Sequence, residues 1–274
     1  NIPIAEKDFM TGKPEKRIKA VFFDIDGTLI SFKTHRMHQS TQKALHALRE
    51  KGIRVYVATG RSKMMMPFMD RYFSFDAYLT LNGQYCYNPR EVIRKKTVDS
   101  GDIRLLKDML AEKPFPCLFV EEDGMFLNYA DERVEKLCEI IDHPMPPMHG
   151  LDRVRDDEVL QFVPFLNEEE EKILTGTLKN VESTRSVPFC FDVIPAGGGK
   201  NAGMHAVLMR EGIAPDETMA FGDGFNDIGM LGYAGIGVAM GNAADAVKAS
   251  ADYVTASVEE GGIAGALEHF GILE

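Results

Sequence analysis

The chain has 274 residues, of which 45% are hydrophobic, so it can bury the core of one large domain or two medium ones. Its formal net charge of −11 argues against nucleic acid or an anionic membrane as a partner, because an acidic surface repels their phosphates. No stretch of the sequence approaches the roughly 18 apolar residues of a membrane span.

Residues 1–17 are too polar for a signal peptide and show no periodic pattern. We expect them to be an N-terminal extension that is partly vector-derived. The four cysteines are scattered without a C-x-x-C pair, which favours reduced thiols over disulfides or a zinc site. A cytoplasmic location is therefore expected, and nothing in the sequence predicts a protein partner.

The first predicted strand is the apolar run 20–23, which leads directly into Asp24 and Asp26. A short run rich in Val and Phe is typical of a strand buried on both faces of a parallel sheet, and ligands bind beyond the carboxyl ends of such strands. Side chains two residues apart point to the same side, so both carboxylates are expected at one site. Gly27 permits a sharp turn, and Thr28 can hydrogen-bond it. The pair suits Mg²⁺ and phosphate chemistry.

Helices and strands then alternate along the chain. Ser40 can cap a helix that ends near Gly52, and the runs 53–57 and 77–80 are predicted to be the second and third strands. This alternation predicts a parallel sheet with right-handed connections. The last third of the chain alternates in the same way, with helices expected over 201–210, near 227–231 and from 243, and strands over 218–221 and 236–239.

The middle of the chain has a different sequence pattern. Residues 84–189 contain hairpin-like segments, separate helices and frequent prolines, and the pair at 123–124 (Asp-Gly) between two apolar runs predicts a hairpin turn. We therefore predict an α/β fold with a Rossmann-like parallel-sheet core, formed by residues 18–83 and 190–274. Residues 84–189 are predicted to form an inserted α+β cap domain.

Further polar residues follow other strands at the same predicted sheet edge. Thr59 and Gly60 follow the second strand and can hold phosphate oxygens through a hydroxyl and backbone N–H groups. The segment 222–227 (GDGFND) adds carboxylates and an amide, which are hard oxygen ligands of the kind that Mg²⁺ prefers. Lys200 follows three glycines at a helix start and supplies a cation that offsets the charge of carboxylates and phosphate.

In this order, the motifs resemble the four-motif pattern of the haloacid dehalogenase superfamily, and in particular its Cof-type phosphatases of subfamily IIB. The resemblance covers about residues 19–267, and the cap matches by position and length. The segments 82–83 (Asn-Gly) and 237–242 (GVAMGN) also resemble that branch. The resemblance implies a Mg²⁺-dependent phosphatase that acts on a small phosphorylated metabolite. Hexose phosphates are the first expected class of substrate, and phosphorylated cofactors are the second.

The resemblance also implies catalytic roles. Asp24 would be the nucleophile that forms an aspartyl-phosphate, and Asp26 would act first as the acid and then as the base. Mg²⁺ would be held by Asp24, the backbone carbonyl of Asp26, and Asp223, with Asp227 in support.

Four residues are implied to bind the substrate phosphate: Thr59, Gly60, Lys200 and Asn226. Arg61 follows Gly60 and has two possible roles. It can bind substrate phosphate or pair with a neighbouring carboxylate, and we leave it outside the catalytic set.

Two other functions stay open. A phosphomutase resembling the phosphomannomutases would need cationic cap residues that clamp a bisphosphate, and the Arg and Lys residues of 84–189 are too scattered to decide. A catalytically silent binding protein could use the same fold. The intact motif residues Asp24, Asp26, Lys200 and Asp223 disfavour that reading. Because a cap can exclude water and select the leaving group, substrate specificity is expected to reside in the cap.

Overall fold

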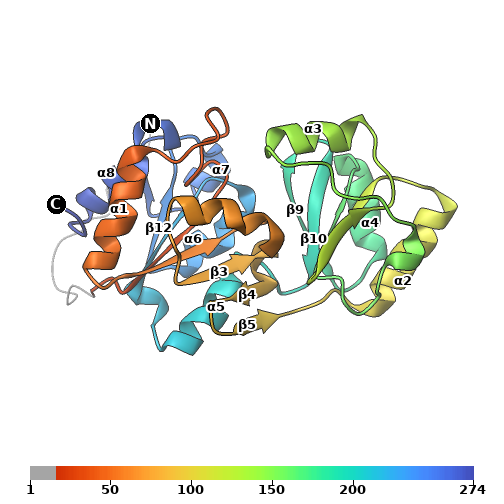
Figure 1. The fold of residues 1–274 in the computed structure, drawn as a ribbon, viewed down its shortest axis with the longest axis horizontal. Helices are drawn as coiled ribbons and strands as arrows, with labels where there is room; N and C mark the ends of the chain where they lie inside the picture. The colour runs from red at the N-terminus through yellow and green to blue at the C-terminus, as the bar shows by residue number, and fades with distance from the viewer. Residues whose placement is uncertain (1–16) are drawn as a thin grey trace, which may run out of the picture.

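The computed structural model describes residues 17–274, except for the side chain of Ser186, so the expected extension at 1–17 lies almost wholly outside the described residues. Two β-sheets divide the described chain into two parts (Figure 1). We call the part built on the eight-stranded sheet the core and the part built on the five-stranded sheet, residues 96–195, the cap. No helix of the described residues is long and apolar enough to cross a membrane.

The core sheet confirms the predicted parallel arrangement. In spatial order its strands are β13 (Tyr253–Val254), β12 (Ile236–Ala239), β11 (Thr218–Gly222), β1 (Ala20–Phe23), β2 (Arg54–Ala58), β3 (Ala77–Thr80), β4 (Tyr85–Tyr87) and β5 (Val92–Lys95). All pairs from β13 to β3 are parallel, and β4 and β5 are antiparallel. Phe23 at the end of β1 is in register with Val57 and Phe221, so three strands end together at one edge.

Helices cover both faces of the core sheet. One face carries α1 (Gln39–Glu50) and α8 (Gly262–His269), the other carries α5 (Lys200–Glu211) and α6 (Ile228–Tyr233), and the short α7 (Asp245–Lys248) follows β12. Strand β1 is fully buried between these layers, with Val21 and Phe23 on one side and Ala20 and Phe22 on the other. This burial explains why the strand is apolar at every position.

Helix α1 differs from its predicted start. It begins at Gln39, and its N-cap is His38 rather than Ser40, because the His38 side chain accepts a hydrogen bond from the Ser40 backbone N–H. The cap position is thus filled two residues earlier than the sequence indicates. Residues 44, 45 and 48 of α1 are buried against the sheet, as an apolar helix face requires.

The cap is an antiparallel sheet with helices. Its strands, in spatial order, are β7 (Gly124–Leu127), β6 (Cys117–Glu121), β8 (Gln161–Pro164), β10 (Cys190–Pro195) and β9 (Val181–Val187). Helices α2 (Ser100–Glu112) and α4 (Glu168–Thr177) pack on one face, and α3 (Glu132–Ile140) packs in a separate apolar cluster nearer the core (Figure 1). The predicted hairpin at 123–124 is confirmed between β6 and β7.

The boundaries of the insertion differ from the expected positions 84 and 189. Strands β4 and β5 extend the core sheet and β10 belongs to the cap sheet, so the sheets change over near residues 96 and 195. The difference arises because a hairpin at the edge of the core sheet and a hairpin of the cap have the same local sequence pattern of short strands joined by turns. The two connections lie side by side, since Lys96 Nζ donates to the backbone oxygen of Ala196 over 2.6 Å.

Candidate active site

The deepest part of the site is a buried ion pair. Asp24 follows β1 at the carboxyl edge of the core sheet and is only 6% exposed, and Lys200, the first residue of α5, is 1% exposed. Lys200 Nζ lies 2.5 Å from Asp24 Oδ1 and 2.7 Å from Asp227 Oδ1. Burial opposes the charge of Lys200, but the two carboxylates outweigh burial and raise its pKa, so the side chain stays protonated.

Three carboxylates gather around this lysine. Oxygen atoms of Asp24, Asp223 and Asp227 lie within 4.8 Å of one another. Burial raises the pKa of Asp24 well above its usual range, and burial together with Asp227 raises the pKa of Asp223 to about 7. Three carboxylates face one lysine, so when all three are ionised they carry more negative charge than the lysine offsets. Hard oxygen donors in such a setting fit a divalent cation.

The loop after β11 is fixed by its own side chains. Asp227 Oδ2 accepts hydrogen bonds from the backbone N–H groups of Asp223, over 3.0 Å, and Gly224, over 2.9 Å. Thr28 Oγ1 donates to Asp223 Oδ1 over 2.9 Å. Both oxygens of Asp227 are thus engaged by Lys200 and this loop, so Asp227 positions Asp223 and Lys200.

Gly27 brings the first motif against this loop. Its φ is +89°, and a Cβ atom at this position would overlap the carboxylate of Asp223. We expect Gly27→Ala to displace Asp223 and to lower kcat by about 100-fold, a loss typical of a misplacement of about 1 Å. Steady-state kinetics would test this. Gly52→Ala is the matched control, because Gly52 also has a positive φ of +75° but open space around its Cβ position. Equal activity of the two variants would contradict the prediction.

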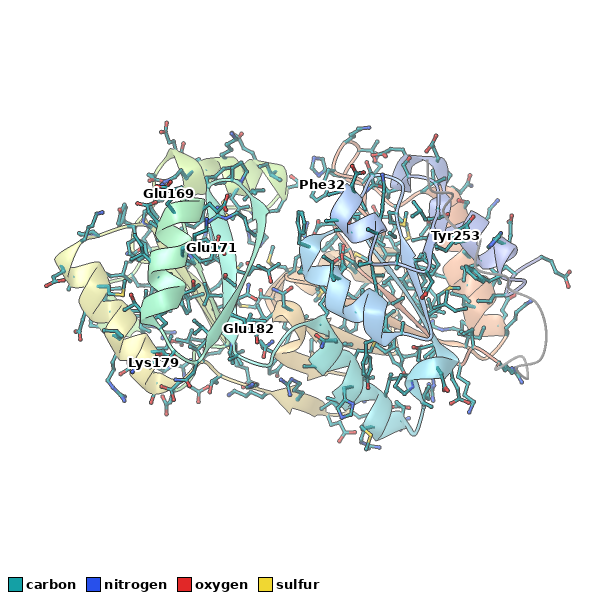
Figure 2. All side chains as sticks on the ribbon, turned by 180° about the vertical axis from the view of Figure 1, so that it is seen from behind. Phe32, Glu169, Glu171, Lys179, Glu182 and Tyr253 are labelled. Carbon is teal, nitrogen blue, oxygen red and sulfur yellow. The ribbon has the colours of Figure 1, made fainter. Side chains whose placement is uncertain are left out.

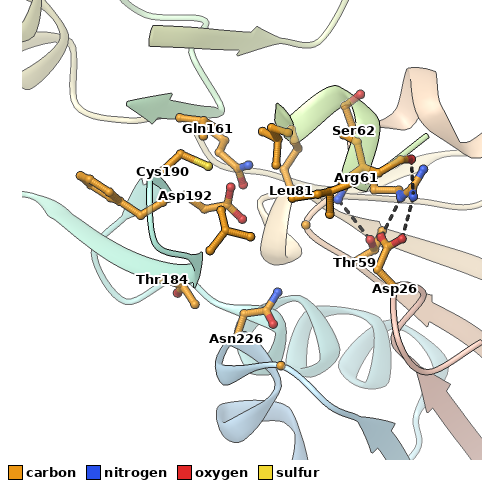
Figure 3. Close-up of a pocket in the computed structure, with 18 of the residues that line it drawn as sticks. Asp26, Thr59, Arg61, Ser62, Leu81, Gln161, Thr184, Cys190, Asp192 and Asn226 are labelled. Carbon is orange, nitrogen blue, oxygen red and sulfur yellow. Dashed lines mark hydrogen bonds and ion pairs between the residues drawn. The ribbon is translucent and has the colours of Figure 1, made fainter. Parts of the chain in front are cut away.

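Asp26, the second of the two aspartates that follow β1, pairs with Arg61 and not with Lys200. Arg61 Nε and Nη2 donate to the two carboxylate oxygens of Asp26 over 2.7 and 2.6 Å (Figure 3). Arg61 Nη2 also donates to the backbone oxygen of Ile141 in the cap over 3.1 Å. In this structure Arg61 therefore pairs with a carboxylate, the second of the two roles that its sequence position left open.

A cavity of about 390 Å³ lies between the core and the cap, with Asp24 and Asp26 in its wall. Thr59, Gly60 and Asn226 line it as well, so the core motifs meet at one place. Thr59 Oγ1 accepts a hydrogen bond from the Arg61 backbone N–H over 3.1 Å. Lys200 lies behind this wall, in contact with Asp24.

The other walls of the cavity come from apolar side chains. Phe32 projects from the core at the side that faces the cap (Figure 2) and lines the cavity. From the cap, the cavity receives Leu118, Val120, Met125, Leu137, Ile140, Ile141, Val163, Val187 and Phe191. A molecule bound in the cavity would therefore contact mainly apolar surface on the cap side.

Three polar residues of the cavity region were missed by the sequence analysis in this role. Asp192 on β10 and Gln161 on β8 line the cavity (Figure 3). Asn82, which follows β3, hydrogen-bonds both of them. A signal existed for Asp192, which interrupts the apolar strand CFDVIP. A polar residue in an otherwise apolar, buried strand indicates a polar partner or a site, and the partner is identified only in the folded chain.

Residues 21–267 match the family model of the haloacid dehalogenase-like hydrolases. The chain belongs to this family. Among solved structures, this haloacid dehalogenase-like hydrolase is similar to the subclass IIB sugar phosphatase BT4131, with 41% identity and a TM-score of 0.88 over 93% of this chain and 100% of that one. It is also similar to the phosphatase BT1666 from Bacteroides thetaiotaomicron, with 34% identity and a TM-score of 0.87 over 97% and 100% of the two chains.

Another relative is named for a substrate other than a simple sugar phosphate. The 5-amino-6-(5-phospho-D-ribitylamino)uracil phosphatase YcsE of Bacillus subtilis is 29% identical over 261 residues, which cover 92% of this chain and 96% of the relative. Together with the similarity to the subclass IIB sugar phosphatase BT4131, this similarity supports a phosphoric monoester hydrolase of the haloacid dehalogenase superfamily.

Proposed function

We propose that this haloacid dehalogenase-like hydrolase is a Mg²⁺-dependent phosphatase that hydrolyses hexose phosphates through an aspartyl-phosphate. The observation that carries the proposal is the geometry of Asp24. Its Oδ1 is held by the buried Lys200, and Asp24 also lines the cavity. None of the described residues hydrogen-bonds Asp24 Oδ2, so this oxygen is available to attack phosphorus.

The proposed reaction has two steps. In the first, Asp24 Oδ2 forms a bond to phosphorus while the bond to the leaving alcohol breaks, and Asp26 gives a proton to the alcohol oxygen. In the second, water attacks phosphorus, gives a proton to Asp26 and releases phosphate and the Asp24 carboxylate. Asp26 is expected to exchange its contact with Arg61 for the leaving-group oxygen when substrate binds.

The remaining core residues would hold the phosphoryl group in place. Lys200 offsets the negative charge at Asp24, and the Thr59 hydroxyl and the backbone N–H of Gly60 would bind phosphoryl oxygens. Asn226 lies at the same cavity wall and would contribute its amide. These groups would be preorganised, because Thr59 and Lys200 are buried and already hydrogen-bonded.

The acidic cluster fits Mg²⁺ in this proposal. Asp24 and Asp223 would be carboxylate ligands, together with the backbone carbonyl of Asp26. Asp227 would support them, since its oxygens already accept hydrogen bonds from Lys200 and from the loop after β11. When bound, the ion supplies positive charge that offsets the charge of the phosphoryl oxygens.

The cap wall favours hydrolysis over the phosphomutase alternative. A mutase must hold a bisphosphate, which calls for cationic side chains in the cap. Among the described residues that line the cavity, the cap contributes no Lys, Arg or His. The similarity to a sugar phosphatase supports hexose phosphates as the first substrate class, and the similarity to YcsE supports larger phosphorylated metabolites as the second.

The test is phosphate release from hexose phosphates, nucleotides, flavin mononucleotide and pyridoxal phosphate, each with Mg²⁺ and with EDTA. We expect release from hexose phosphates that falls by at least about 100-fold in EDTA and returns with added Mg²⁺. Release that persists unchanged in EDTA would contradict the role of the metal. Interconversion of hexose phosphates with a bisphosphate primer, without phosphate release, would establish a mutase instead.

A further inference from the structure

The cap wall of the cavity is apolar except along three neighbouring strands. Its polar residues are Gln161 on β8, Thr184 on β9, and Cys190 and Asp192 on β10. Strand β10 lies between β8 and β9 in the sheet, so these side chains come from adjacent strands. Figure 3 shows Gln161 and Asp192 at the same part of the cavity. Two of these four side chains, Gln161 and Asp192, are joined through a third residue of the core.

That third residue is Asn82, whose amide connects the cap to the core. Asn82 Nδ2 donates to Asp192 Oδ2 over 2.8 Å and to Gln161 Oε1 over 3.2 Å. Asn82 Oδ1 accepts from Asn226 Nδ2 over 2.9 Å. The backbone of Asn82 lies in the left-handed region, with φ of 52° next to φ of 53° at Leu81. Such a backbone is uncommon outside glycine, and here it directs a buried amide between the two domains.

The carboxylate of Asp192 fixes the direction of every hydrogen bond in this group. An ionised carboxylate only accepts hydrogen bonds, so Asn82 must present its Nδ2 to Asp192. The second proton on Nδ2 then requires the oxygen of Gln161, and this turns Gln161 Nε2 away from Asn82. Burial raises the pKa of Asp192 to about 6, with the Asn82 hydrogen bond opposing that rise, so the carboxylate form prevails at neutral pH.

Two polar atoms are left without a protein partner. None of the described residues hydrogen-bonds Asp192 Oδ1 or Gln161 Nε2, although Gln161 is only 3% exposed and both residues line the cavity. Asp192 Oδ1 is an acceptor and Gln161 Nε2 is a donor, and both side chains accept a hydrogen bond from Asn82 Nδ2. A hydroxyl group both donates and accepts, so one hydroxyl can satisfy both atoms. Both atoms belong to residues of the cavity wall, so a molecule bound in the cavity can pair with them.

We propose that Asp192 and Gln161 form a hydroxyl-recognition pair that selects the leaving group of the substrate. The leaving group would donate one hydroxyl hydrogen bond to Asp192 Oδ1 and accept one from Gln161 Nε2. The pair thus favours phosphate monoesters whose leaving group bears hydroxyls and no charge, and it repels a leaving group that carries a second phosphate or a carboxylate. This inference rests on the proposed phosphatase activity and assigns specificity to two residues of the cap.

Asp192→Asn is the decisive variant, because the asparagine oxygen can still accept from Asn82 while the cavity-facing acceptor becomes a donor. We expect kcat/KM for the best hexose phosphate to fall about tenfold or more. We expect less than about a twofold change for 4-nitrophenyl phosphate, whose leaving group lacks a hydroxyl donor before the bond breaks. Fructose 1,6-bisphosphate should gain relative to fructose 6-phosphate in this variant, because a repelling charge is removed.

Exchanging the carboxylate and the amide between positions 192 and 161 provides a rescue test. Gln161→Glu alone places two carboxylates together and should lower hexose phosphate hydrolysis. Combining it with Asp192→Asn restores one acceptor and one donor in exchanged positions, and should recover part of the lost kcat/KM. Thr184→Val is the matched control, since Thr184 lines the same wall but belongs to no hydrogen bond of this group. It should change both substrates by less than about twofold.

Other results would overturn the inference in distinguishable ways. An equal loss on both substrates in Asp192→Asn would show that Asp192 only supports the fold of the site. Unchanged hexose phosphate hydrolysis, or a wild type that hydrolyses 4-nitrophenyl phosphate but no hexose phosphate, would refute the pair and leave the phosphatase intact. A wild type that hydrolyses neither substrate with Mg²⁺ would refute the proposed function itself.

Discussion

Asp24→Asn is expected to lower phosphate release by at least about 10⁴-fold, because an amide cannot replace the carboxylate oxygen that we propose attacks phosphorus. The variant should stay folded. Lys200 keeps its contact with Asp227, and a neutral amide next to Asp223 and Asp227 removes repulsion between buried carboxylates. The melting temperature without metal should therefore be no lower than that of the wild type.

Two measurements separate the loss of chemistry from the loss of structure. Phosphate release is measured with saturating hexose phosphate, and thermal unfolding is followed with and without Mg²⁺. Mg²⁺ should raise the melting temperature of the wild type more than that of the variant, because one proposed ligand is lost. Asp108→Asn is the control, since Asp108 lies exposed on α2 and the charge change is the same. Substantial activity in Asp24→Asn would rule out Asp24 as the nucleophile.

Lys200→Met is expected to be the most destabilising of these substitutions. It removes the only cation in contact with Asp24 and Asp227 among the described residues, and it leaves buried carboxylates without a partner. Breaking a buried ion pair from one side costs roughly 3–5 kcal/mol of unfolding free energy. Catalysis should be lost as well, because Lys200 offsets the negative charge of the site.

Urea unfolding of the metal-free protein tests this cost. The loss of unfolding free energy in Lys200→Met, relative to the wild type, should become smaller as the pH falls. Without Lys200, a buried carboxyl has a raised pKa, so its protonated form is tolerated in the folded state. As the pH rises through that pKa, the carboxyl ionises and the folded state is destabilised. Adding Asp24→Asn should recover part of the lost stability. Lys172→Met is the control, since Lys172 forms an exposed pair with Glu168 worth less than about 1 kcal/mol. A loss of under about 1 kcal/mol in Lys200→Met would contradict the argument.

The sequence was most informative where the chemistry follows a strand. Apolar runs of strand length predict that the core strands are parallel, and polar residues at the carboxyl ends of parallel strands meet at one edge of the sheet. Asp24, Thr59 and Asp223 could therefore be placed together before the fold was known. The structure brings them together, with Lys200 beside them.

Other features depend on contacts that no local pattern encodes. Strands β4 and β5 could pair with either sheet, and only the folded chain assigns them to the core. The partner of Arg61 could be a phosphate or a carboxylate, and local sequence does not say which carboxylate is near. Asn82, Gln161 and Asp192 come from three distant segments, so their shared hydrogen bonds arise only through tertiary packing.

The two connections between core and cap, at Lys96 and Ala196, lie side by side, and this has an evolutionary consequence. Because the chain leaves the core and returns to it at neighbouring points, the ends of the insertion are close together. A different insertion with close ends can be accepted there without changing any strand that carries Asp24, Thr59 or Asp223. Replacing residues 96–195 is therefore expected to change the cap wall of the cavity, and with it the proposed choice of substrate, while the core residues that line the cavity stay in place.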